Sequence, residues 1–261
     1  MRETKVYLLD LGTITLDGFQ MFWNIGPGGI IRFPVYGVLV DHADGRYLFD
    51  TGFDKEVFDS LSPGRTTQTR EQTIAGQLDL IGLKPSDINY VINSHYHLDH
   101  CGGNKHCTHA TTICHQCELD AVGNPQPFER GYIDKSFMGE IAVDPDGPGQ
   151  DIYTPKFEAL TGDQEIAKGI HMIETPGHTP GHYSLMVELA GRRPMIFTGD
   201  ACYAKRSVEN LAIASSHTDA RAAYDSLVKL RDMAEQRNAE LFYSHDPEAW
   251  QTFVQAPGYY S

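Results

Sequence analysis

One short stretch constrains this 261-residue chain more than any other, because it places four metal-liganding side chains within six residues. The order is His-x-His-x-Asp-His over residues 95–100, and residues 88–93 (INYVIN) ahead of it are typical of a buried strand. Side chains two apart share one face of an extended chain, so His95 and His97 can point into one site. A turn toward a helix near Gly102 would bring Asp99 and His100 to a neighbouring position. Two pairs on one bend predict two adjacent metals, and the alternative is a polar turn with solvated histidines.

The composition limits the classes of partner. A formal net charge of −14 argues against nucleic acid, because contact with phosphates needs a basic surface. No signal peptide is recognisable, and no apolar run approaches the roughly 18 residues of a membrane span, so we expect a cytoplasmic protein without a membrane partner. Five cysteines, an odd number, favour reduced thiols. The pair Cys114 and Cys117 allows a structural zinc, but no second pair has zinc-finger spacing, so we expect both to pack as small hydrophobic side chains.

Helical and strand patterns are interspersed along the chain, without an internal repeat. Residues 66–80 and 219–236 carry apolar side chains at helical spacing. The segments typical of strands are 5–16, 33–41, 46–50, 111–115, 169–174, 183–189, 194–198 and 240–244. The composition between 121 and 157 is loop-like, which predicts a substrate or lid insertion there, with disorder as the alternative. The length suits one large domain or two small ones, and we expect a single domain over residues 1–261.

Three further candidate ligands, His178, Asp200 and His245, also follow predicted strands, which is where layered α+β proteins usually build sites. Five histidines and two aspartates suit Zn²⁺, with Mn²⁺, Fe²⁺ or Co²⁺ as alternatives. The natural division is His95, His97 and His178 on one metal, Asp99, His100 and His245 on the other, and Asp200 between them. Asp50, at the end of another predicted strand, either orients a metal-bound histidine or caps a turn.

The motif series resembles the metallo-β-lactamase superfamily. The resemblance rests on the HxHxDH motif, the Gly-His at 177–178 between prolines, the Gly-Asp at 199–200 and His245 near the end of the sequence. The resemblance implies an α+β fold, a four-layer αββα sandwich. Asp200 stands where drug-hydrolysing members place Cys, which speaks against a β-lactamase. Only 16 residues follow His245, which leaves no room for the helical domain of glyoxalase II enzymes.

Within the superfamily, the chain resembles the lactonase branch. Tyr203 stands where N-acyl-homoserine lactonases have a tyrosine that reaches the substrate carbonyl, and a core aromatic is the alternative. The chain is also similar over most of its length to the 4-pyridoxolactonases of vitamin B6 degradation, although residues 139–157 differ. This similarity rests on residues 22–29, 32–36, 95–105, 124–129 and 243–246.

This resemblance implies a zinc-dependent lactonase with two Zn²⁺ per chain. It implies that metal-activated water opens 4-pyridoxolactone to 4-pyridoxate, with Asp99 as proton carrier and Tyr203 as oxyanion donor. A small-molecule lactone is therefore the expected partner. Whether the chain forms a homo-oligomer is left open by the sequence. The candidate substrate contacts are Phe22, Trp23, Phe128, Arg130 and Tyr132.

Two other functions remain as alternatives. An N-acyl-homoserine lactonase, which quenches quorum signals, needs a longer apolar channel for the acyl tail. A protein of another class would be a non-hydrolytic metal-binding scaffold or a diiron redox protein, and the latter normally needs an attached flavin domain. Lactone kinetics and metal content separate these alternatives.

Overall fold

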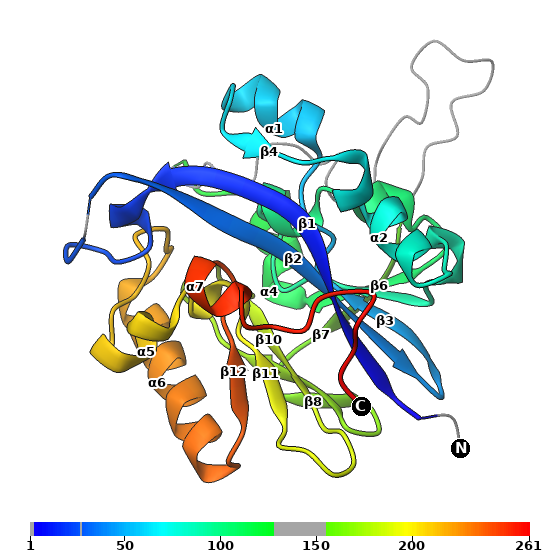
Figure 1. Ribbon diagram of the computed structural model, residues 1–261. Coiled ribbons are helices and arrows are strands. Elements are labelled where there is room, and N and C mark those ends of the chain that lie inside the picture. The colour runs from blue at the N-terminus through cyan, green and yellow to red at the C-terminus, as the bar shows by residue number, and fades with distance from the viewer. Residues whose placement is uncertain (1–2, 27, 128–154) are drawn as a thin grey trace.

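Two β-sheets pack face to face at the centre of the computed structural model of the chain (Figure 1). The structure describes residues 3–26, 28–127 and 155–261. The first sheet has the order β4-β1-β2-β3-β5-β6-β7, and the second has the order β12-β11-β10-β9-β8. None of the helices in these ranges is long and apolar enough to cross a membrane.

The strands of the first sheet are β1 (Lys5–Asp17), β2 (Ile30–His42), β3 (Gly45–Phe49), β4 (Thr66–Thr67), β5 (Tyr90–Ile92), β6 (Thr111–His115) and β7 (Lys156–Leu160). Those of the second sheet are β8 (Gln164–Ala167), β9 (Ile170–Glu174), β10 (Tyr183–Val187), β11 (Met195–Phe197) and β12 (Glu240–Phe242). The α-helices are α1 (Lys55–Leu61), α2 (Ile74–Leu80), α3 (Leu98–Cys101), α4 (Gln116–Gly123), α5 (Lys205–Asn210), α6 (Ala220–Gln236) and α7 (Pro247–Trp250).

Alternation of side chains along the strands produces the layers. On β10, Leu185 points into the core between the two sheets, whereas its neighbour Met186 packs with Leu227 and Leu230 of α6. On the first sheet, residues such as Leu48 pack outward in a cluster that includes α2. Each sheet therefore has one face on its partner and one face under helices, and the expected four-layer αββα arrangement is confirmed (Figure 1).

One expectation about an individual element needs correction. The helix expected over residues 66–80 begins only at Ile74, because residues 66–67 pair with β1 as strand β4 and Thr73 caps the helix through the N–H of Gly76 at 3.1 Å. The insertion expected at about 121–157 overlaps regular structure at both ends, where α4 continues to Gly123 and β7 begins at Lys156. Residues 128–154 lie outside the described residues. The assignment of residues 1–261 to one domain stays a prediction.

Candidate metal centre

All seven candidate ligands follow strands and meet at one edge of the sandwich. His95 and His97 follow β5, and Asp99 and His100 lie on the short helix α3 directly after them. The other three come from the second sheet. His178 lies between β9 and β10, Asp200 lies in a turn after β11, and His245 follows β12. Because β11 and β12 are parallel neighbours, their ends deliver Asp200 and His245 side by side.

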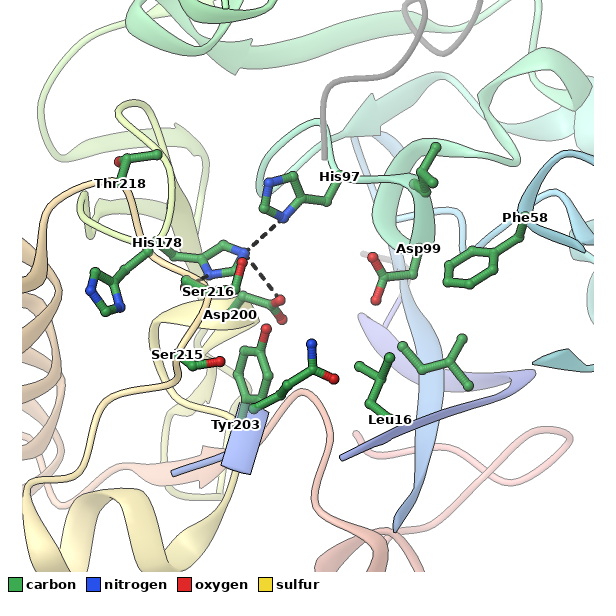
Figure 2. Close-up of a pocket in the computed structure, with 14 residues that line it drawn as sticks. Leu16, Phe58, His97, Asp99, His178, Asp200, Tyr203, Ser215, Ser216 and Thr218 are labelled. Carbon is green, nitrogen blue, oxygen red and sulfur yellow. Dashed lines mark hydrogen bonds and ion pairs between the residues drawn. The ribbon is translucent and has the colours of Figure 1, made fainter. Parts of the chain in front are cut away.

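The imidazoles of His95, His97 and His178 form the first group. The His178 Nε2 atom lies 3.1 Å from His95 Nε2, 2.9 Å from His97 Nδ1 and 3.2 Å from Asp200 Oδ2. Figure 2 shows His178 between His97 and Asp200, with Tyr203 beside them. Three nitrogens and one carboxylate oxygen thus converge on one point.

The side chains of Asp99, His100 and His245 form the second group. The other oxygen of Asp200, Oδ1, lies 3.2 Å from His100 Nε2 and 3.1 Å from His245 Nε2. The Asp99 Oδ2 atom lies 3.7 and 3.6 Å from the same two nitrogens. Asp200 therefore presents one oxygen to each group, which is the position of a bridging ligand.

Metal ions fit both groups. Four ligands at about 2.0–2.1 Å in a tetrahedron lie about 3.3 Å from one another, close to the separations above. In addition, His100 Nε2 and Asp200 Oδ1 are buried and have no hydrogen-bond partner among the described residues. Buried polar atoms are normally satisfied, so an imidazole nitrogen and a carboxylate oxygen that lie 3.2 Å apart without forming a hydrogen bond fit a pair of ligands to one cation.

The opposite ring nitrogen of four histidines is held by a hydrogen bond, which turns Nε2 toward the site. Each of these nitrogens lies 2.7–2.9 Å from its acceptor. The pairs are His95 with Ser94 Oγ, His100 with Asp50 Oδ2, His178 with the Ser216 carbonyl and His245 with the Pro34 carbonyl.

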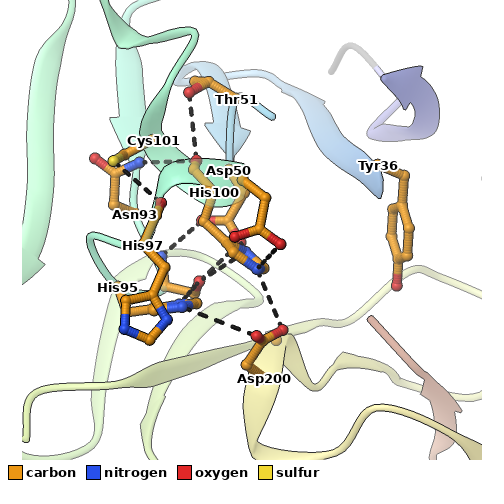
Figure 3. A network of polar contacts seen from close by, with 12 residues as sticks. Tyr36, Asp50, Thr51, Asn93, His95, His97, His100, Cys101 and Asp200 are labelled. Atoms are coloured by element: carbon orange, nitrogen blue, oxygen red, sulfur yellow. Dashed lines mark hydrogen bonds and ion pairs between the residues drawn. The ribbon is translucent and has the colours of Figure 1, made fainter. Parts of the chain in front are cut away.

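Asp50 orients the second group through His100, as Figure 3 shows. Its carboxylate also accepts the Ser94 N–H and the Ser94 hydroxyl, each at 2.8 Å. The backbone at Asp50 has φ of 57°, an uncommon conformation for a residue other than glycine. Of the two roles expected for Asp50, orientation of a candidate metal ligand is the one that these contacts fit.

Charges within the site shift the pKa values in opposite directions. Burial raises the pKa of Asp200, but the neighbouring His100, His245 and His178 outweigh this effect and hold its pKa well below the ordinary value. Burial lowers the pKa of His100, but the carboxylates of Asp200, Asp99 and Asp50 raise it well above the ordinary value. Burial dominates at His95, whose pKa is well below that of a free imidazole. The centre therefore combines an ionised carboxylate with at least one neutral imidazole at neutral pH.

A cavity of about 410 Å³ opens onto both groups. Its lining includes the apolar side chains Ile14, Leu16, Phe58 and Leu98 and the polar residues Gln20, Ser215, Ser216, His217 and Thr218. Asp99, Asp200 and Tyr203 also line it. The Tyr203 ring centroid lies 4.9 Å from that of His245 and 6.0 Å from that of His178. Burial, with Asp200 and Asp99 nearby, raises the pKa of Tyr203 well above its ordinary value, so the phenol is neutral and can donate.

The candidate substrate contacts are not placed as expected. Phe22 is buried in the core and does not line this cavity, because its ring packs inward with Arg206 over its face. Trp23 is 41% exposed and does not line the cavity itself, but its ring packs on that of His217, a lining residue, with the ring centroids 4.6 Å apart. Phe128, Arg130 and Tyr132 lie outside the described residues.

Several residues that support the site were not predicted from the sequence. His182 is fully buried, accepts the Asp200 N–H at 2.9 Å and contacts Thr175 Oγ1 at 2.9 Å. A signal for it existed, since it repeats the Thr-Pro-Gly-His pattern of His178 four residues later. The carbonyls of Ser216 and Pro34 had no such signal, because any residue supplies a carbonyl.

The cysteines do not form a further metal site in the described part of the chain. Cys114 is buried, as expected, but Cys117 is exposed on the first turn of α4 rather than packed. Among the described residues, the groups of side chains close enough to hold a metal include neither of them. The expectation for Cys117 was wrong because Cys114 lies on the buried strand β6, whereas Cys117 lies on α4, whose buried side chains are Glu118 and Val122.

Comparisons with known proteins agree with this geometry. The model of the metallo-beta-lactamase superfamily matches residues 30–245. The N-acyl homoserine lactonase AttM of Rhizobium radiobacter is 31% identical over 279 aligned positions that cover 100% of both chains. An N-acyl homoserine lactonase of a Bacillus species is 27% identical, with 95% of each chain covered. A solved N-acyl homoserine lactone hydrolase, with N-hexanoyl-L-homoserine as product at its catalytic metal centre, superimposes with a TM-score of 0.84 at 26% identity over 100% of both chains.

Proposed function

We propose that this chain, which belongs to the metallo-beta-lactamase superfamily, is a lactone hydrolase that acts on N-acyl homoserine lactones. The observation that carries the proposal is the division of the two Asp200 oxygens between two groups of ligands at the floor of a cavity. We propose zinc as the metal at both groups, since nitrogen-rich sets of this kind suit it.

In this proposal, His95, His97 and His178 would hold one cation, Asp99, His100 and His245 would hold the other, and Asp200 would offer one oxygen to each group. Two such cations, when bound, supply Lewis acidity and lower the pKa of water toward about 7. Hydrogen bonds keep four of the histidine rings in place. In each ring, the nitrogen that points away from the site donates to Ser94, to Asp50 or to one of two backbone carbonyls.

Ring opening breaks the bond between the carbonyl carbon and the ring oxygen and forms one from that carbon to a water oxygen. The neutral phenol of Tyr203 donates a hydrogen bond to the carbonyl oxygen as negative charge develops there. Asp99 lines the cavity, and its carboxylate contacts His100 and His245 only at 3.6–3.7 Å. We assign it the transfer of the proton from water to the departing ring oxygen.

The comparisons support N-acyl homoserine lactones better than 4-pyridoxolactone, the substrate expected first from the sequence. The cavity adds a physical reason. Its side lined by Ile14, Leu16 and Phe58 offers an apolar surface for an acyl tail, and its side lined by Ser215 and His217 offers polar partners for an amide.

A panel of lactones tests the proposal. The protein with two bound metals is assayed with N-hexanoyl- and N-decanoyl-homoserine lactone and with 4-pyridoxolactone, and mass spectrometry detects the water-added product. We expect hydrolysis of the homoserine lactones, with kcat/KM higher for the longer tail because each buried methylene contributes up to about 0.8 kcal/mol. A clear preference for 4-pyridoxolactone would reassign the substrate. Full metal content with no lactone opened would overturn the proposed function.

A further inference from the structure

We propose that Glu118 is a positioning residue for the first group of ligands, because its carboxylate ties together the two loops that carry them. The inference rests on the proposed function insofar as His95, His97 and His178 hold a metal there. Glu118 lies in the first turn of α4, outside the candidate ligand set, and its side chain is fully buried.

Each oxygen of Glu118 accepts a backbone N–H from a different ligand loop. Oε1 accepts the N–H of Tyr96, which lies between His95 and His97, at 3.0 Å. Oε2 accepts the N–H of Gly181, three residues after His178, also at 3.0 Å. One side chain therefore fixes the distance between the loops whose imidazole nitrogens meet at 2.9–3.1 Å.

The contact with the second loop leaves no room for adjustment. A β-carbon on Gly181 would lie 2.3 Å from the backbone nitrogen of Glu118, so the loop runs directly against α4. A backbone hydrogen bond from Tyr183 N to Ser94 O at 2.8 Å joins the same two segments beyond the ligands. The Glu118 carboxylate thus lies at the point where α4 and both loops meet.

The second group is supported from another direction. His100 is held by Asp50, and its backbone carbonyl accepts the N–H of Thr51 at 2.8 Å. These contacts come from the segment after β3 and do not involve α4. Loss of the Glu118 carboxylate should therefore act on one metal position and spare the other.

Glutamine is the informative replacement because it has nearly the same shape and one acceptor oxygen instead of two. In Glu118→Gln, the amide NH₂ would face one of the two backbone N–H groups, donor against donor, in a fully buried place. Val122→Ala is the matched control, because Val122 lies one turn later on α4 and packs in the cluster of Tyr96 and Cys114 without contributing an acceptor.

The experiment measures metal affinity by chelator competition and resolves occupancy by anomalous diffraction at each of the two positions. We expect Glu118→Gln to weaken binding at His95, His97 and His178 by about 10–100-fold, as for other residues that orient ligands, and to leave the second position unchanged. Val122→Ala should lower the melting temperature and leave both affinities as in the wild type.

Equal losses at both positions, or the same selective loss in Val122→Ala, would overturn the inference. If Glu118→Gln does not fold, Glu118→Asp is measured instead. It keeps both oxygens but is one methylene too short to reach both loops, and we expect the same selective loss. A wild-type chain that binds no metal would overturn the proposed function and this inference together. Two bound metals in the wild type and unchanged affinities in the Glu118 variant would overturn the inference alone.

Discussion

Asp200 and Tyr203 lie three residues apart and serve the proposed site in different ways. Asp200 faces both groups of histidines, and these histidines hold its pKa low, so its contribution is to the binding of metal. Tyr203 lines the same cavity with a neutral hydroxyl, and Asp200 is among the groups that keep its pKa high. Metal retention and turnover should therefore respond separately to substitution at these two positions.

Replacement of Tyr203 by Phe tests this separation. The variant keeps the ring that packs against His245 and loses the donor to the carbonyl oxygen. We expect kcat for lactone opening to fall by about 10²–10³-fold, the range for removal of one oxyanion donor, with unchanged metal content by elemental analysis. Asp200→Asn is the contrast and should lose metal. Loss of metal from Tyr203→Phe, or turnover equal to the wild type, would contradict the assigned role.

At the scale of elements, the strand ends were the part of the site that the sequence predicted well. The pattern of strands followed by His or Asp named all seven side chains that the fold brings together, because a buried strand and a cluster of His and Asp residues both leave strong signals. The order of strands in the sheets left no such signal, since β4 pairs with β1 across more than fifty residues of sequence. The carbonyl partners of His178 and His245 were equally hidden.

Aromatic residues in loops were the weakest part of the prediction. Phe22 and Trp23 are adjacent in the segment between β1 and β2, yet Phe22 is buried in the core and the ring of Trp23 packs on His217. Composition alone does not tell a pocket wall from a core residue, because both places favour large apolar rings. That distinction needed the position of the loop relative to β1 and β2.

Strand β6 and helix α4 give opposite environments to Cys114 and Cys117. Burial raises the pKa of Cys107 and Cys114 to about 12, so only about one thiol in ten thousand is ionised at pH 8. Partial burial and nearby carboxylates raise the pKa of Cys117 as well, but its thiol is exposed to the reagent. We expect a thiol reagent at pH 8 to label one cysteine rapidly in the native protein and all five in urea. Cys117→Ser should abolish the rapid phase. Protection of Cys117 in the native protein would instead favour a structural metal at this pair.

At the scale of the whole molecule, the proposed metals connect the two halves of the sandwich. The first sheet supplies His95, His97, Asp99 and His100 after β5, and the second supplies His178, Asp200 and His245. In the described part of the chain, buried polar atoms of the site lack a hydrogen bond, among them His100 Nε2 and Asp200 Oδ1. A bound cation at either group should therefore stabilise the contact between the sheets as well as supply chemistry.

Removal of metal should consequently lower the melting temperature. A ligand present at a thousand times its Kd stabilises the folded state by about 4 kcal/mol, and each kcal/mol shifts Tm by about 2–4 °C in a domain of this size. We expect a strong chelator to lower Tm by about 8–16 °C for each metal removed, as measured by scanning calorimetry, with recovery on addition of Zn²⁺. The control is the double variant His178→Ala with His245→Ala, which lacks one ligand of each group and whose Tm should not respond to the chelator. If elemental analysis showed the metal gone while Tm stayed the same, the cations would contribute only to chemistry, and the packing between the sheets would be sufficient to hold the sandwich together.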